Sequence, residues 1–188
     1  LTRCGAACLE LAAMTPFLYG IEARELTWDL QEMLCGARVT SNYIRIGGVK
    51  HDLIPGFAEK CRDGIAKIRA LLHDFDEVIT GNRIFVDRLK GTGVISQEEC
   101  LRYAVTGPIL RSAGVGLDLG KQEPYLVYDQ LDFDIPVGEV GDNYDRYLVC
   151  VEEMHQSLRI IEQCLARLEK LGPGPVNALD PRVRWPAK

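Results

Sequence analysis

The sequence predicts a mostly α-helical protein, in which long helices form a bundle and β structure is minor. Residues 142–171 carry apolar side chains at helical spacing, and residues 19–35 and 55–78 show the same pattern. Strand-like patterns are confined to short segments. A length of 188 residues is enough for one domain with a core, and we find no internal repeat or linker. We therefore predict a single domain over residues 1–188.

Helix signals begin at the N-terminus. Residues 1–15 are apolar with small residues on several faces, which is typical of a helix buried on most sides. Pro16 should end this helix, because its ring disfavours helix at the residue before it. The second helix, residues 19–35, should end at Gly36, which suits a left-handed C-terminal cap.

The middle of the chain is less regular. Residues 43–46 indicate a brief extended piece, broken by the two glycines that follow. Pro55 suits the start of the third helix, at residues 55–78. We expect residues 81–95 to be a loop with short extended pieces.

The last part should begin with a short helix at residues 96–104, since Ser96 and Glu99 form a capping-box pattern. Residues 106–141 are rich in glycine, which predicts irregular structure, and within them residues 125–137 favour a short strand or an extended loop. The final helix, residues 142–171, should end at Gly172-Pro173.

The amino-acid composition excludes some classes of function. The hydrophobic fraction is 47%, the charged fraction is 26% and the net charge is −5, which argues against a general nucleic-acid binder and gives no polybasic patch for a membrane. No apolar run approaches the roughly 20 residues that span a bilayer. A partner would therefore have to hold the chain at any membrane. The start at Leu1 and the proline-punctuated residues 179–188 lead us to expect that both ends are cuts in a longer chain, or that the chain depends on neighbours.

The seven cysteines form no CxxC pair and are odd in number, which indicates reduced thiols rather than a disulfide framework. Cys4 and Cys8 would share a helix face; metal binding there is an alternative to simple burial, which we favour. No motif for nucleophilic or nucleotide chemistry is present. Four Gly-, Pro- and Arg-rich segments nevertheless look over-specified for packing, and such segments often line sites or subunit contacts. They are Thr15–Phe17, residues 43–49, residues 106–111, and residues 133–138 with 141–147.

These segments carry a family resemblance. In order, the chain contains AMTPF, ARVTSNYIRIGGVKHDL, GNRIF, GTGVIS, VTGPILR, DFDIPVG, GDNYDRYLV, EEM and QSLRIIEQCL. This series resembles the D subunit of bacterial NADH:quinone oxidoreductase, the counterpart of the large hydrophilic quinone-site subunit of mitochondrial complex I. The resemblance covers essentially the whole chain and roughly half of the family's length, so the chain would be an internal segment of a larger subunit.

The resemblance implies a fold like that of the large subunit of nickel–iron hydrogenases, without a bound metal or cofactor. It implies a core subunit that forms the quinone-reduction site and couples electron transfer to proton translocation. Its expected partners are a small subunit with the terminal [4Fe–4S] cluster, other hydrophilic-arm subunits and membrane-arm subunits, with quinone as substrate. The expected location is peripheral, on the cytoplasmic face of the bacterial inner membrane or the matrix side in mitochondria. The isolated chain should be inactive.

The same resemblance assigns site residues. Glu10 aligns with an aspartate that pairs with a quinone-site histidine, so it would stabilise the protonated imidazole and supply a proton. The alternative is a helix carboxylate paired with Arg3 or another neighbour. Arg45 would hold the negative charge of a reduced cluster or semiquinone, and Arg38 would share that role; alternatively, both bind carbonyls of nearby loops.

Phe17, Tyr43 and Thr40 complete the set expected near the pocket or cluster. Thr40 stands where many members have a histidine that titrates with the cluster, so proton–electron coupling there should be weaker. Gly120 and Cys150 replace residues that are usually arginine. Two competing functions remain: the large subunit of a related membrane-bound hydrogenase or dehydrogenase, and a non-catalytic helical scaffold fragment.

Overall fold

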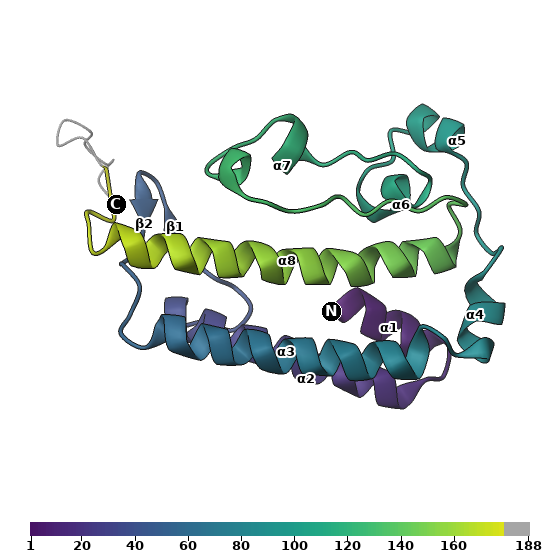
Figure 1. Cartoon of the computed structure of the whole chain (residues 1–188), viewed down its shortest axis with the longest axis horizontal. Coiled ribbons are helices and arrows are strands. Elements are labelled where there is room, and N and C mark those ends of the chain that lie inside the picture. Colours follow the sequence, from purple (N-terminus) through teal and green to yellow (C-terminus); the bar gives the residue numbers. More distant parts are fainter. Residues whose placement is uncertain (179–188) are drawn as a thin grey trace, which may run out of the picture.

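Three long helices form the frame of the computed structural model, which describes residues 1–178 (Figure 1). The helices α2, α3 and α8 run lengthwise beside one another, and the shorter α1 lies between α2 and α8. Eleven elements are found in the described part of the chain. They are α1 Thr2–Glu10, α2 Met14–Cys35, β1 Ile44–Arg45, β2 Gly48–Val49, α3 Phe57–Ile79, α4 Arg83–Leu89, α5 Gln97–Arg102, α6 Gly107–Ser112, α7 Leu119–Gln122, the 3-10 helix η1 Tyr128–Gln130, and α8 Asn143–Leu171.

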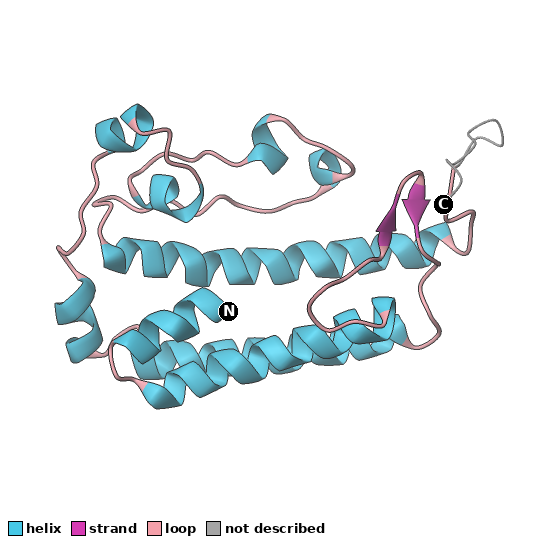
Figure 2. Cartoon of the chain, turned by 180° about the vertical axis from the view of Figure 1, so that it is seen from behind, coloured by secondary structure: helices cyan, strands magenta, loops and turns pink. Residues whose placement is uncertain are grey.

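The molecule has three layers, with α8 in the middle. One face of α8 packs on α1 and α3, and its other face carries the layer of short helices and loops that follows α4 (Figures 1 and 2). That layer is held to α8 by polar contacts as well as packing. Arg159 of α8 forms ion pairs with Asp132 and Asp134 of the loop. The side-chain oxygen of Gln163 accepts the backbone N–H of Asp132 at 2.8 Å.

Buried apolar side chains form two clusters along the bundle and a third beneath α5 and α6. The first cluster joins α1, the end of α3, α4 and the start of α8, and the second joins α2, α3 and the C-terminal half of α8. The third contains Cys100, Leu110 and Ala113. On the surface, Arg69 of α3 pairs with Glu162 of α8 at 2.8 Å. Such exposed pairs contribute only about 0–1 kcal/mol each, so apolar burial holds the bundle together.

The sequence predictions for the longest elements are confirmed. The structure is mostly helical, and α8 ends at Leu171 with Gly172 as its cap. Gly36 caps α2 in the left-handed conformation, with φ of 80°. The capping box at Ser96 is formed, since its hydroxyl accepts the N–H of Glu99 and the Glu99 carboxylate accepts the N–H of Ser96.

The predicted break between the first two helices is wrong by several residues. Helix α1 already ends at Glu10, and α2 begins at Met14 rather than at residue 19. A turn closes α1, because the N–H of Ala13 returns to the carbonyl of Cys8 at 2.8 Å while Ala12 adopts a positive φ of 63°. Pro16 then falls in the first turn of α2, where its missing N–H has no intrahelical partner to lose.

The prediction of loop and extended structure over residues 81–95 is also wrong in part, because α4 forms there. The side chain of Asn82 accepts the N–H groups of Ile84 and Phe85, which starts the helix, and burial of Phe85 in the first core cluster stabilises it.

The irregular stretch is partly as predicted. Residues 125–137 form an extended loop with η1, one of the two alternatives expected. The short helices α6 and α7 interrupt the segment for which irregular structure is predicted. The expectation for residues 179–188 lies outside the described residues.

Candidate functional site

The predicted site residues fall into two groups, and the first lies on a hairpin that follows the end of α2. Strands β1 and β2 pair antiparallel, with Ile44 opposite Val49 and Arg45 opposite Gly48. The phenol of Tyr43 donates to the carbonyl of His51 at 2.6 Å, and its ring meets the His51 ring edge-on. Tyr43 therefore closes the base of the hairpin.

Arg45 stands near the tip of this hairpin. Among residues 1–178 its side chain makes no hydrogen bond or ion pair, and it is exposed. Its neighbours Ile44 and Ile46 are 85% and 71% exposed. Thr40 is exposed as well. The hairpin thus presents apolar side chains and one cation to its surroundings.

Arg38 is bound differently. Its guanidinium donates to Asp29 at 2.6 Å, to Glu32 at 3.0 Å and to Glu25 at 2.5 Å, all on α2. Hydrogen bonds to these carboxylates, that to Asp29 first, raise the pKa of Arg38 above its usual value. Arg38 therefore binds three carboxylates of its own chain, rather than the loop carbonyls considered from the sequence.

Glu10 and Phe17 form the second group, at the other end of α2. Glu10 is the last residue of α1, is exposed, and makes no ion pair with Arg3 or any other residue of the described range. Phe17 packs across Gly5, where a Cβ would lie 3.6 Å from Phe17 Cδ2. Helix α2 has 22 residues and is therefore about 33 Å long, and the hairpin follows its opposite end. The structure therefore does not bring Glu10 and Arg45 together.

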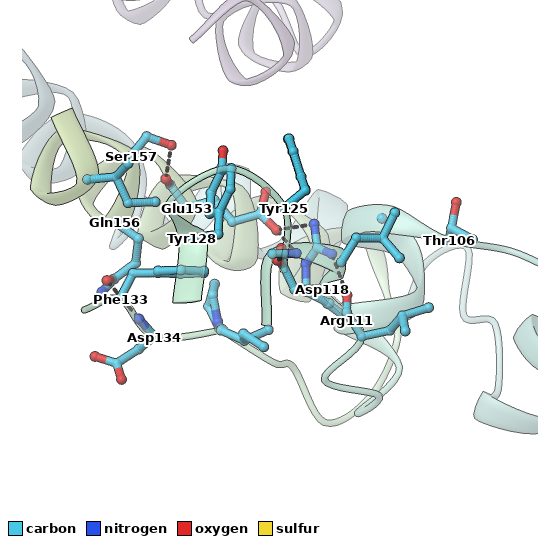
Figure 3. Close-up of a pocket in the computed structure, with 17 residues that line it drawn as sticks. Thr106, Arg111, Asp118, Tyr125, Tyr128, Phe133, Asp134, Glu153, Gln156 and Ser157 are labelled. Carbon is cyan, nitrogen blue, oxygen red and sulfur yellow. Dashed lines mark hydrogen bonds and ion pairs between the residues drawn. The ribbon is translucent and has the colours of Figure 1, made fainter. Parts of the chain in front are cut away.

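A cavity of about 560 Å³ lies elsewhere, between α8 and the short-helix layer (Figure 3). Two segments singled out in the sequence meet there, since Thr106, Arg111 and residues 133–136 all line it. The opposite wall is a face of α8. This wall was not found from the sequence, although its residues recur at helical spacing: Glu153, Gln156, Ser157 and Ile160.

A largely buried ion pair lies at this cavity. Arg111 Nε donates to Glu153 Oε1 at 2.6 Å and its Nη1 donates to the carbonyl of Leu117 at 2.8 Å (Figure 3). Ser157 donates to the backbone carbonyl of Glu153 at 2.7 Å. The lining thus joins charged side chains with the aromatic rings of Tyr125, Tyr128 and Phe133.

Neither a metal centre nor a membrane span is seen in the described residues. Within residues 1–178, no group of three or more His, Cys, Asp or Glu side chains is arranged to hold a metal ion. No helix in that range is both long and apolar enough to cross a bilayer. Cys4 and Cys8 are buried, in agreement with the packing interpretation of their spacing.

Comparison with known proteins identifies the family to which the sequence belongs. The model of the family described as "Respiratory-chain NADH dehydrogenase, 49 Kd subunit" matches residues 10–188. The chain is 50% identical over all its 188 residues to D subunit 1 of the NADH-quinone oxidoreductase of Anaeromyxobacter dehalogenans, of which it covers 43%. It is 48% identical over the same length to the D subunit of Myxococcus xanthus, covering 45%. Over 167 residues, 89% of the chain, it is 50% identical to C/D subunit 1 of Aquifex aeolicus, of which it covers 28%.

The chain thus spans less than half the length of these relatives. All three relatives are named as subunits of NADH-quinone oxidoreductase, and none of the three is named as a hydrogenase. The match over most of the chain shows that it belongs to the family of the 49 kDa subunit of respiratory-chain NADH dehydrogenase, whose bacterial members are named as the D subunit of NADH-quinone oxidoreductase.

Proposed function

We propose that this chain forms part of the quinone-reduction site of an NADH:quinone oxidoreductase, beside a small subunit that carries the terminal [4Fe–4S] cluster. The relatives are named for this enzyme, and the chain spans less than half of each of them. The proposal includes coupling of electron transfer to proton translocation. It also includes a hydrogenase large-subunit-like fold, into which the bundle would be built.

The exposed hairpin is the observation that carries the proposal. Ile44 and Ile46 leave most of their apolar surface in water. Exposed apolar side chains that lie together are typical of a surface that a partner covers. Between them, Arg45 offers a guanidinium whose N–H donors are all free within the described chain. Covered by the cluster-bearing subunit, this cation would lose its water and stabilise negative charge strongly.

Glu10 would act at a separate point. Its carboxylate is exposed and unpaired in the described chain, so it is free to pair with a histidine and to favour the protonated imidazole. Helix α2 keeps Glu10 far from Arg45, so the two residues would have different roles. Glu10 would help to supply a proton to the quinone, and Arg45 would stabilise the negative charge that the electrons bring. Parts of the longer relatives that this chain does not span would complete the quinone site.

Partners follow from the same relatives. The Aquifex aeolicus protein carries the letters C and D in one subunit name. We infer that a C subunit lies beside this chain, together with the cluster-bearing and membrane-arm subunits. The complex would hold the chain peripherally at the cytoplasmic face of the inner membrane.

The test uses the full-length subunit in the assembled complex. Arg45→Ala should lower quinone reductase activity by about tenfold or more, since removing one charge-stabilising donor typically has at least that effect. Glu10→Ala should lower it as well. Oxidation of NADH with an artificial acceptor should persist in both variants, because that reaction does not need the quinone site.

Arg83→Ala is the matched control, since Arg83 is an exposed arginine paired with Asp87 on its own helix. It should leave both activities unchanged. If complexes with Arg45→Ala and Glu10→Ala assemble and reduce quinone at the wild-type rate, these site assignments are wrong.

A further inference from the structure

The loop between α7 and η1 exposes apolar side chains that the described chain does not cover. Every residue from Lys121 to Val127 is exposed, and among them Tyr125 and Leu126 leave 56% and 85% of their surface in water. Leu119 of α7 is 64% exposed (α7 in Figure 1). Apolar side chains gathered in this way are typical of a surface that contacts another protein. Residues 118–130 are called the α7–η1 surface below.

The backbone holds Leu126 in this exposed position under strain. Within residues 1–178, three residues other than glycine have a positive φ: Ala12, Ala104 and Leu126, the last at 53°. The two alanines follow the ends of α1 and α5, where a left-handed residue commonly closes a helix. Leu126 instead lies in a turn closed by the N–H of Tyr128 on the carbonyl of Tyr125 at 3.2 Å, where glycine or asparagine would fit with less strain. A strained leucine that is almost wholly exposed points to a contact outside its own chain.

The same surface is acidic. From residue 118 to residue 134 the sequence has five carboxylates and one basic residue. Arg159 of α8 pairs with two of these carboxylates, those of Asp132 and Asp134. The carboxylates of Glu123 and Asp129 are exposed and form no ion pair or hydrogen bond within residues 1–178. Because contacting surfaces of proteins carry complementary charges, a partner that covers this surface should be basic.

The α7–η1 surface borders the cavity of about 560 Å³, whose wall offers a place for a cation. The rings of Tyr125 and Tyr128 lie in the wall with their centroids 4.9 Å apart (Figure 3), and aromatic faces attract cations. Two carboxylates of the wall each keep one oxygen without a hydrogen bond in the described chain. One is Asp118, whose other oxygen accepts a backbone N–H at 2.8 Å. The second is Glu153, whose other oxygen binds Arg111.

We propose that the α7–η1 surface docks a basic segment of another subunit of the oxidoreductase complex. Apolar side chains of that segment pack on Tyr125 and Leu126, and its positive charges face Glu123 and Asp129. One of its lysine or arginine side chains enters the cavity and binds the free oxygen of Asp118.

A basic protein segment accounts for the three features together. A small organic cation would fill the cavity but leave Leu126 in water. An apolar part of the same subunit would cover Leu126 but leave the carboxylates of Glu123 and Asp129 unpaired. The proposal needs only that the chain is one subunit of a larger enzyme. It does not rest on the quinone site, so the activities of the Arg45→Ala and Glu10→Ala variants do not bear on it.

Zero-length cross-linking of the assembled wild-type complex identifies the occupant. A water-soluble carbodiimide joins a carboxylate to a lysine amine in contact with it, and glycinamide added with it caps carboxylates that solvent can reach. We expect peptides in which Glu123 or Asp129 is linked to a lysine of another subunit. Links only to lysines of the same subunit would overturn the proposal, because its own polypeptide would then cover the surface. Capping of both carboxylates as complete as in the urea-unfolded complex would overturn it too.

Charge reversal tests the electrostatic part in the full-length subunit. The double variant Glu123→Lys, Asp129→Lys should lower the retention of partner subunits severalfold when the complex is purified at moderate salt, because opposite charges become like charges. Asp74→Lys is the matched control, since Asp74 is an exposed carboxylate of α3 that forms no ion pair in the described chain. It should leave retention unchanged.

Leu126→Asn tests the apolar contact. Asparagine tolerates a positive φ, so the turn keeps its conformation while the apolar side chain is lost. Retention of partner subunits should fall severalfold, whereas Leu101→Asn, at a leucine of α5 that is 59% exposed, should leave it unchanged. If the double charge variant and Leu126→Asn both retain every subunit as firmly as their controls, the α7–η1 surface is not a docking site.

Discussion

Single carboxylates explain why the GDNYDRY segment looks over-specified in the sequence. Asp142 is buried, and its two oxygens accept the N–H of Gly91 at 2.7 Å and the N–H of Asp145 at 2.8 Å. One oxygen of Asp145 accepts the N–H groups of residues 139–141, at 2.9, 2.6 and 3.3 Å. The composition of the segment predicts a site or a subunit contact. Within the described chain it ties the distant loop at Gly91 and the turn just before α8 to the start of that helix.

Replacing Asp142 tests this role. Asp142→Ala should lower the free energy of unfolding by about 2–4 kcal/mol, because it removes a helix cap and leaves the N–H of Gly91 unpaired. Urea denaturation of the full-length subunit measures the change, and hydrogen exchange at Gly91 should become faster. Asp63→Ala on the exposed face of α3 is the control and should change stability by less than about 0.5 kcal/mol. Equal stabilities of the two variants would contradict the structural role.

Among the elements, α8 has protein on both of its faces. Its C-terminal half packs on α2 and α3 through Leu158 and Leu165, while the cavity and the short-helix layer occupy the other side. The apolar spacing in the sequence predicts one buried face. The polar residues between them, Arg159 and Gln163 included, bind the loop layer. A helix that looks amphipathic is therefore covered by protein on its polar face too.

Substitutions at two leucines of α8 distinguish the effect of burial on stability from the effect of helix propensity. Leu158 is 5% exposed and Leu168 is 43% exposed. Leu158→Ala should cost about 2–5 kcal/mol, since it opens a cavity in the second core cluster. Leu168→Ala makes the same chemical change on the same helix and should cost far less. Thermal unfolding of the full-length subunit measures both, and a similar loss for the two variants would show that α8 is not packed as described.

At the scale of the whole molecule, the hairpin that bears Arg45 is held by the segment after α8. The N–H of Val49 donates to the carbonyl of Val176 at 2.9 Å, and the N–H of Ala178 donates to the carbonyl of Gly47 at 2.8 Å. The position of the proposed charge-stabilising arginine thus depends on residues more than a hundred positions further along the chain.

A substitution at Gly48 should disrupt the pairing between the hairpin and the segment after α8. A Cβ at Gly48 would lie 2.1 Å from the carbonyl oxygen of Val176, a backbone atom that cannot swing aside. Gly48→Ala should therefore release the segment, with faster hydrogen exchange at Val49 and Ala178, and should lower quinone reductase activity through Arg45. Gly81→Ala, where a Cβ meets nothing within 4 Å, is the control. Unchanged exchange in Gly48→Ala would mean that the two segments are not paired.

Features that depend on neighbours along the chain follow from the amino-acid sequence without a structure. The long helices, the cap at Gly36, the capping box at Ser96 and the end of α8 were all predicted, because each is set by side chains and backbone groups within one or two turns. The ordered motifs also indicated the family, since their order along the chain does not depend on folding.

Features that depend on residues far apart emerge only when the helices pack. The burial of Phe85 that stabilises α4 and the meeting of Arg111 with Glu153 each need two elements to come together first. The same holds for the separation of Glu10 from Arg45. Spacing along a chain fixes which side chains share a face of one helix, but the packing of helices fixes which faces meet.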